Sequence, residues 1–184
     1  MKSKILLKIL MPLFLLFASN VLIAQIVTST TTLTGLSTTY GTASSNNTFD
    51  VSGSTLTADI NINAPSGFEV STSPVGGFGA SVVLTQTLGS VALTPIYVRI
   101  AATSNVAGSP YSGNISVSTT GHPTIDVAIA SSTVAAKGLT ISGLTASNKV
   151  YNATTAATLT GTAALVGVET ADLANVTLGG SASA

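Results

Sequence analysis

Apolar and polar residues alternate along three stretches of this 184-residue chain, and this alternation limits the possible folds more than any other feature. Successive side chains of a β-strand point to opposite faces, so an alternating stretch buries one face and exposes the other. The three stretches lie at residues 56–62, 96–100 and 125–129. Beyond the first 24 residues, no segment shows the 3.6-residue period of a helix of ordinary length. The chain is therefore expected to be all-β.

Shorter β-type stretches and regularly spaced turns complete the pattern. Further strands are expected at residues 48–52, 68–71, 81–86 and 114–119. The clusters between the strands are rich in Gly, Pro and Asn, which supply positive φ or remove a backbone donor at turns. About seven short strands with turns at this spacing predict an antiparallel β-sandwich of immunoglobulin-like type. We place this sandwich at residues 25–136.

The first 24 residues have the order of a secretory signal peptide. Three lysines precede an apolar stretch at residues 9–17, and the small Ala24 suits cleavage before Gln25. The alternative is an uncleaved anchor, because residues 5–24 approach the roughly 20 residues that span a bilayer. Pro12 and two polar residues interrupt that run, which favours cleavage. We expect a secreted or cell-surface protein with no membrane span after signal cleavage.

The composition argues against several function classes. Only 7% of the residues are charged, so the basic surface that a nucleic-acid-binding protein needs is missing. With no Cys, the chain has neither disulfides nor thiolate metal sites. The one histidine, His122, has no nucleophile and acid beside it, and Asp59 and Asp126 alternate with apolar positions and should face solvent. We therefore expect no enzyme, no catalytic residue, no cofactor and no metal ligand.

A second β pattern follows the sandwich. Residues 131–138 are expected to be a short linker, and a new unit is placed at residues 137–184. Its opening at residues 141–145, with Tyr151 after it, is similar to residues 33–37 with Tyr40 after them. This match is short enough to arise by chance in a Thr-rich chain, but its offset of one sandwich length agrees with tandem modules.

The second unit contains a recognisable motif. Residues 139–161, followed by residues 163–167, resemble the opening half of a YDG domain, a β module that recurs in large bacterial surface proteins. The family is named for the run Lys-Val-Tyr-Asp-Gly-Thr-Thr, from which this chain departs by having Asn and Ala in place of Asp and Gly. The resemblance implies a truncated second β module, because the family module continues further. It also implies structural roles for Lys149, Val150, Tyr151, Asn152, Thr154 and Thr155.

The first unit resembles a sandwich repeat that often accompanies YDG modules. The resemblance rests on residues 51–60, 64–71, 95–100 and 111–118. Proteins with these repeats come from bacteria that use type IX secretion, and they are secreted or cell-surface, often adhesin-like. The resemblance implies a non-catalytic structural or adhesive module of a repetitive bacterial protein. Its expected partners are extracellular polysaccharide or other cell-surface proteins.

A carbohydrate-binding accessory sandwich of a larger secreted enzyme is the alternative function. That role needs an exposed aromatic platform, and the chain has no Trp. Tyr97, which should face outward beside Arg99, is the best candidate for a ligand contact. The other interpretation of Tyr97 is a cross-strand pair on a solvent-facing sheet. Tyr111, just before the strand at residues 114–119, is expected to form a tyrosine corner, with sugar stacking as its alternative role.

Overall fold

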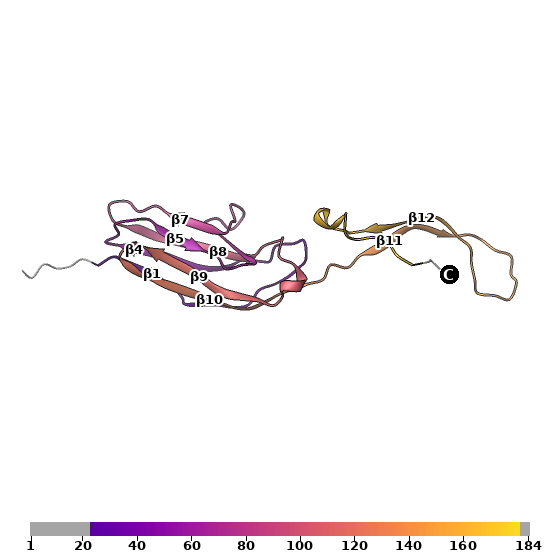
Figure 1. Cartoon of the computed structure of the whole chain (residues 1–184), viewed down its shortest axis with the longest axis horizontal. Coiled ribbons are helices and arrows are strands. Elements are labelled where there is room, and N and C mark those ends of the chain that lie inside the picture. The colour runs from indigo at the N-terminus through magenta and orange to yellow at the C-terminus, as the bar shows by residue number, and fades with distance from the viewer. Residues whose placement is uncertain (1–22, 181–184) are drawn as a thin grey trace, which may run out of the picture.

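The computed structural model describes residues 23–180, in which two β units follow each other along the chain (Figure 1). Strands hold 52% of the residues, and 4% are helical. The described helical segments are single 3-10 turns, η2 (Val106–Gly108) and η3 (Thr170–Asp172). The expectation of an all-β protein is thus confirmed. Residues 1–22, which hold most of the expected signal peptide, lie outside the described residues.

One sheet of the first unit contains four antiparallel strands. Their order across the sheet is β1 (Gln25–Thr28), β4 (Asn47–Ser54), β8 (Val91–Ile100) and β6 (Phe68–Ser71). All neighbouring pairs are antiparallel. This order corresponds to strands A, B, E and D of an immunoglobulin-type sandwich.

The facing sheet contains six strands. They are β7 (Ser81–Leu84), β5 (Ile60–Asn63), β9 (Tyr111–Thr119), β10 (His122–Ala135), β2 (Thr32–Leu33) and β3 (Ser37–Thr39). The short strands β2 and β3 both pair in parallel with β10, so the chain leaves the first sheet after β1 and joins the second. Strands β5 and β7 belong to this second sheet, whereas β6 and β8 belong to the first. The chain therefore changes sheet at each step from β5 to β8. The order of β6 and β7 is thus a local departure from the immunoglobulin plan.

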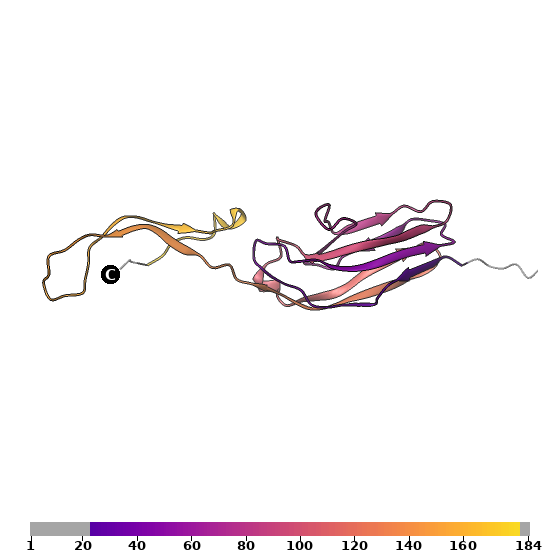
Figure 2. The ribbon, with the colours of Figure 1, turned by 180° about the vertical axis from the view of Figure 1, so that it is seen from behind.

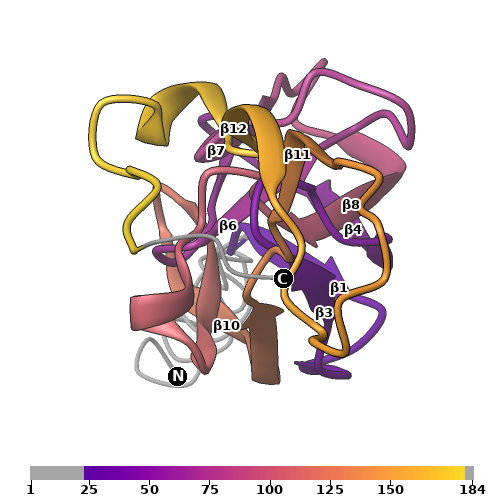
Figure 3. The same cartoon turned by 90° about the vertical axis from the view of Figure 1, so that its right-hand side faces the viewer.

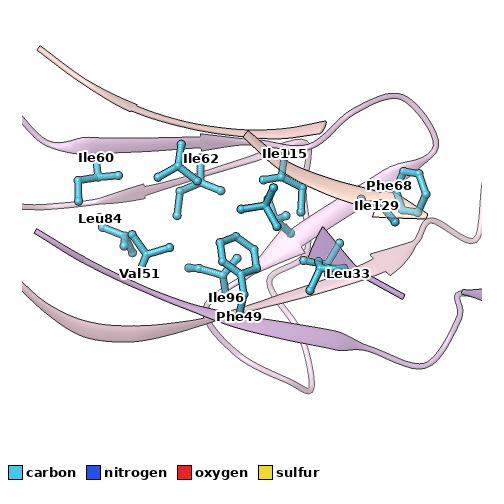
Figure 4. Close-up of a cluster of buried hydrophobic side chains, with 14 of the residues drawn as sticks. Leu33, Phe49, Val51, Ile60, Ile62, Phe68, Leu84, Ile96, Ile115 and Ile129 are labelled. Atoms are coloured by element: carbon cyan, nitrogen blue, oxygen red, sulfur yellow. The ribbon is translucent and has the colours of Figure 1, made fainter. Parts of the chain in front are cut away.

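The core lies between these two sheets (Figure 4). It contains 21 buried apolar side chains, among them Phe49, Ile60, Ile96 and Ile115, which are at most 2% exposed. The alternation in the sequence places them there, because Ile96, Val98 and Ile100 are fully buried while the residues between them are half-buried on the outer face. Burying one such side chain stabilises the fold by about 1.5–3 kcal/mol.

The structure corrects three expected boundaries. The linker does not begin at residue 131, because β10 continues to Ala135 and keeps pairing with β3. The stretch at residues 56–62 becomes a strand only from Ile60, after a turn in which Thr55 has a φ of 53°. Strand β10 begins at His122, three residues before the alternating stretch at residues 125–129.

The second unit is a hairpin without a core of its own. Strands β11 (Thr140–Ala146) and β12 (Leu159–Val166) pair antiparallel and are joined by the loop at residues 147–158 (Figure 2). Between residues 136 and 180 no side chain is buried. An isolated two-stranded hairpin is at best marginally stable in water. The first unit therefore holds the packed core of the described chain.

Ser132 ties the sheet-switching segment to β10. Its hydroxyl accepts a hydrogen bond from the Leu36 backbone N–H at 3.0 Å and donates to the Ala130 carbonyl at 2.9 Å. The Ser132 side chain is fully buried, so water cannot replace these bonds. Gly35 permits the close approach, because a Cβ there would lie 2.2 Å from the Ser131 carbonyl oxygen.

Replacing Ser132 by Ala should destabilise the sandwich by about 1–3 kcal/mol, because the buried Leu36 N–H loses its acceptor. Urea unfolding of the chain from residue 23 onward measures this change. The neighbouring exposed Ser131→Ala is the matched control and should change the free energy of unfolding by less than about 0.5 kcal/mol. Equal effects of the two substitutions would contradict the assigned role of Ser132.

Trypsin should separate the two units. The described basic residues are Arg99 in β8, Lys137 in the linker and Lys149 in the exposed loop. Cleavage needs local opening, which costs least where the chain lacks buried contacts. Mass spectrometry of a digestion time course should show cuts after Lys149 and Lys137 long before any cut after Arg99. Early cleavage at Arg99 would show that the sandwich is not an independent core.

Candidate functional site

Arg99 lies in a small cluster on the outer face of the first sheet. It pairs in register with Glu69 across β8 and β6, and its Nε is 2.6 Å from Glu69 Oε1. Its guanidinium carbon lies 3.7 Å from the centre of the Phe78 ring, in the range of a cation–π contact. Both the charge and the flat face of Arg99 therefore have partners within the sandwich.

Tyr97 shares the outer face of β8 with Arg99. It is half-buried and stands opposite Thr48 on β4 and Ser71 on β6. The structure thus brings the two predicted contact residues onto one face, as their spacing implies. Since Arg99 is already paired with Glu69, this geometry favours the interpretation of the face as a set of cross-strand pairs.

Tyr111 forms the expected tyrosine corner. Its hydroxyl donates to the Asn105 backbone carbonyl at 2.9 Å, and its ring meets Phe68 edge-on at a centroid distance of 6.4 Å. Two glycines make room for the ring, because a Cβ on Gly67 would lie 2.2 Å from Tyr111 Cδ1 and one on Gly108 would lie 2.6 Å from the hydroxyl. The ring is therefore a structural element at the entry of β9.

An open cavity of about 400 Å³ lies beside this corner. Two polar side chains of its lining make internal hydrogen bonds: the Ser104 hydroxyl donates to the Gly67 carbonyl at 2.8 Å, and Asn105 Oδ1 accepts from the Gly108 N–H at 2.7 Å. These bonds shape the end of the sandwich. The cavity therefore offers little of the convergent, unpaired polar lining that a specific small-molecule site uses.

The motif residues at 149–155 form a loop closed by one ammonium group. Lys149 Nζ, with its three N–H donors, lies within hydrogen-bonding distance of four acceptors: Asn152 Oδ1 at 3.0 Å, the Thr154 carbonyl at 2.6 Å, Thr154 Oγ1 at 2.9 Å and the Ala156 carbonyl at 2.7 Å. Thr154 Oγ1 in turn donates to Asn152 Oδ1 at 2.8 Å. Thr155 lies exposed in the same loop. The sequence pattern did not indicate this central role of Lys149.

The closed loop exposes two large side chains. Val150 and Tyr151 are each 88% exposed, next to the anchoring Lys149. Ala153 has a φ of 58°, at the position where the resembled motif has Gly. A left-handed conformation costs a residue with a Cβ about 1–2 kcal/mol, so the contacts of Lys149 hold the loop against local strain. An aromatic ring on an ordered, protruding loop is a chemically suitable contact point.

Three further ionisable side chains of the sandwich contact neighbouring polar groups. Asp126 is exposed and accepts from Asn114 Nδ2 at 3.2 Å. Asp59 is half-buried instead of fully solvent-facing, because it accepts the Gln86 backbone N–H at 3.0 Å. His122 contacts the Pro123 carbonyl through Nδ1. Within residues 23–180, no three His, Asp or Glu side chains gather into a metal-binding group.

A second polar cluster joins the two units and was not indicated by the sequence. Glu169 forms an ion pair with Lys137, and Asp172 lies at the Tyr40 hydroxyl. The pKa of Tyr40 is raised above its ordinary value, first by the hydrogen bond to Asp172 and then by desolvation and the charges of Asp172 and Glu169. These residues come from three separate segments, which only the folded chain brings together.

Comparisons of the chain with family models, with curated proteins and with solved structures find no match. In the described part of the chain, no helix has the length and apolar character needed to cross a membrane. The function is therefore inferred from the residues and geometry of the chain itself.

Replacing Lys149 by Met should loosen the loop, because the side chain keeps a similar length but loses all its donors. Backbone ¹⁵N relaxation should show order parameters of residues 150–156 falling from about 0.85 to below about 0.6. Lys137→Met, which removes the same charge outside the loop, should leave the order parameters of residues 150–156 unchanged relative to those of β11 and β12. Ala153→Gly should retain the ordered loop, because Gly adopts positive φ without a Cβ clash. Unchanged relaxation in Lys149→Met would contradict the anchoring role.

Proposed function

We propose that this chain is a non-catalytic structural or adhesive module of a secreted or cell-surface, repetitive bacterial protein. The observation that carries the proposal is the end-to-end course of the chain (Figure 1). Strand β1 begins at one end of the sandwich, and β10 leaves at the opposite end and leads through residues 136–139 into β11. Units with entry and exit at opposite ends extend a chain when they are repeated.

Export is the second part of the proposal and rests on the first 24 residues. In this interpretation the signal peptide is removed after Ala24. Strand β1 begins directly afterwards, at Gln25. The absence of Cys agrees with a sandwich stabilised by its packed core, and the low charge leaves a surface rich in hydroxyl groups. The second unit is interpreted as a YDG-like β module within a repetitive surface protein.

Contact with the surroundings is assigned to the exposed loop at residues 147–158. Val150 and Tyr151 supply an apolar and aromatic surface, and Lys149 keeps the loop ordered. Binding of a partner then costs little conformational entropy, because the loop is already ordered. Extracellular polysaccharide and other cell-surface proteins are the proposed partner classes. The alternative role, a carbohydrate-binding accessory sandwich, has less support because Arg99 beside Tyr97 is already paired with Glu69.

Cell-surface labelling tests the proposal. Antibodies raised against residues 25–136 should label intact cells of the source organism, or detect the protein in the medium. An antibody against a cytoplasmic protein is the control and should label permeabilised cells only. Detection of the chain only after permeabilisation would contradict the proposal.

Adhesion assays test the assigned contact loop. Beads coated with the chain from residue 23 onward should bind surfaces coated with the organism's own extracellular polysaccharide or surface-protein extract. Tyr151→Ala should lower the number of retained beads at least about fivefold, because a buried aromatic contact is often worth more than 1 kcal/mol. Tyr97→Ala is the matched control and should leave retention unchanged. The opposite ranking of the two variants would favour the carbohydrate-binding alternative on the sandwich face.

A further inference from the structure

The turn after β12 contacts the end of the sandwich. Residues 169–172 fold back on themselves, since the Asp172 N–H donates to the Glu169 carbonyl at 2.9 Å, and the Asn175 N–H donates to the Asp172 carbonyl at 2.8 Å. This turn contains η3 (Figure 3) and carries the acidic residues Glu169 and Asp172. Glu169 pairs with Lys137 in the linker and lies against Gly41 of the sandwich, so this turn bridges the second unit to the first.

Gly41 makes this approach sterically possible. A Cβ on Gly41 would lie 2.2 Å from Glu169 Oε1 and 2.4 Å from Glu169 Cδ. Gly41 also has a φ of 84°, a conformation that residues with a Cβ rarely adopt. The sandwich surface beside Tyr40 is thus shaped to accept the Glu169 side chain.

Apolar side chains of both units lie near the ion pair. A cavity of about 220 Å³ lies between the units, and its walls include Tyr40, Val106, Leu139, Val168 and Val176. An ion pair beside apolar side chains is screened less by water than a fully exposed pair.

The second unit depends on this contact for a fixed orientation. Its hairpin has no buried side chain, and the short linker at residues 136–139 forms no strand. Such a linker by itself permits rotation about several backbone dihedrals. A contact on one side of the linker removes that freedom.

We propose that the turn at residues 169–172 is a latch that docks on the Tyr40 end of the sandwich and fixes the direction in which the second unit leaves the first. Glu169 binds Lys137 over Gly41, and Asp172 lines the same cavity as Tyr40. The existence of the latch stands on these contacts alone. Its use, to set the stiffness of an extended array, rests on the proposed function.

Distance measurements between two labels test the latch. The chain has no Cys, so Thr87→Cys in the sandwich and Asn148→Cys in the hairpin loop introduce the only labelling sites. Pulsed electron paramagnetic resonance on spin labels at these exposed positions should give one narrow distance distribution. Lys137→Glu should broaden it by placing like charges together, and the added Glu169→Lys should restore it by reversing the pair. High salt should broaden the distribution of the unsubstituted chain in part.

Gly41→Ala should also broaden the distribution, because the new Cβ displaces Glu169. Gly77→Ala is the matched control: its φ of 71° carries the same backbone strain, but a Cβ there meets only Ser71 Oγ at 3.5 Å. This control should leave the distribution narrow. Circular dichroism of each variant shows whether the sandwich is still folded.

Tyrosine ionisation gives an independent readout. The raised pKa of Tyr40 should return toward 10.0 in Asp172→Asn, which removes the charged acceptor. The ultraviolet absorbance of tyrosinate, compared with a Tyr40→Phe chain, isolates this one side chain among the four tyrosines. The titrating groups of the latch are Tyr40, Lys137, Glu169 and Asp172. Neutral Tyr40 favours the closed latch, so its contribution to closure is fully present below the ordinary tyrosine pKa and is lost as the pH rises through the raised value.

A broad distribution in the unsubstituted chain, or a narrow one in both Lys137→Glu and Gly41→Ala, would overturn the latch. An unchanged Tyr40 pKa in Asp172→Asn would remove Asp172 from it. These results are separable from the proposed function, which cell-surface labelling tests. A narrow distribution in a chain that never reaches the surface would retain the latch and reject its role in a surface array.

Discussion

Burial of one apolar face of each sheet is the interaction on which this structure depends. The chain has no Cys, and only 7% of its residues are charged, so neither disulfides nor charge networks can replace a packed core. The 21 buried apolar side chains between the sheets supply the dominant stabilising term. This constraint also separates the two units. The sandwich has two faces to pack together, whereas the hairpin has no second layer among the described residues and buries nothing.

Strand β10 sets the direction in which the chain leaves the sandwich. It pairs with β9 on one side and with β2 and β3 on the other, and it continues to Ala135 at the end of the sandwich. The following residues therefore leave from a rigid strand. The latch at residues 169–172 then contacts the same end of the sandwich. A firm exit strand and a contact beside the linker together define an extended geometry, which is what a spacer or adhesive module needs.

Most polar side chains of the sandwich maintain its shape. Arg99 is paired with Glu69 and stacked on Phe78, and Tyr111 closes a corner against Gly67. The loop of the second unit differs, because Lys149 holds its backbone while Val150 and Tyr151 remain exposed. The chemistry available for contact therefore lies on this loop, while the sandwich supports and directs it. This division of roles is the physical basis of the proposed structural or adhesive function.

The sequence alone determined the all-β class, strands such as β6 and the buried rows of β8, because side-chain alternation is a local property of the strand. It also indicated the Tyr111 corner and singled out the motif around Lys149. The tertiary structure decided the rest. Strands β1, β2 and β3 are too short to show a recognisable alternation of apolar and polar residues. Strands β2 and β3 form because they pair with β10, which is distant in the sequence. The sequence likewise did not predict the contact among Tyr40, Lys137 and Glu169. Ion pairs and steric fits, such as that of Glu169 against Gly41, depend on distances that only folding sets.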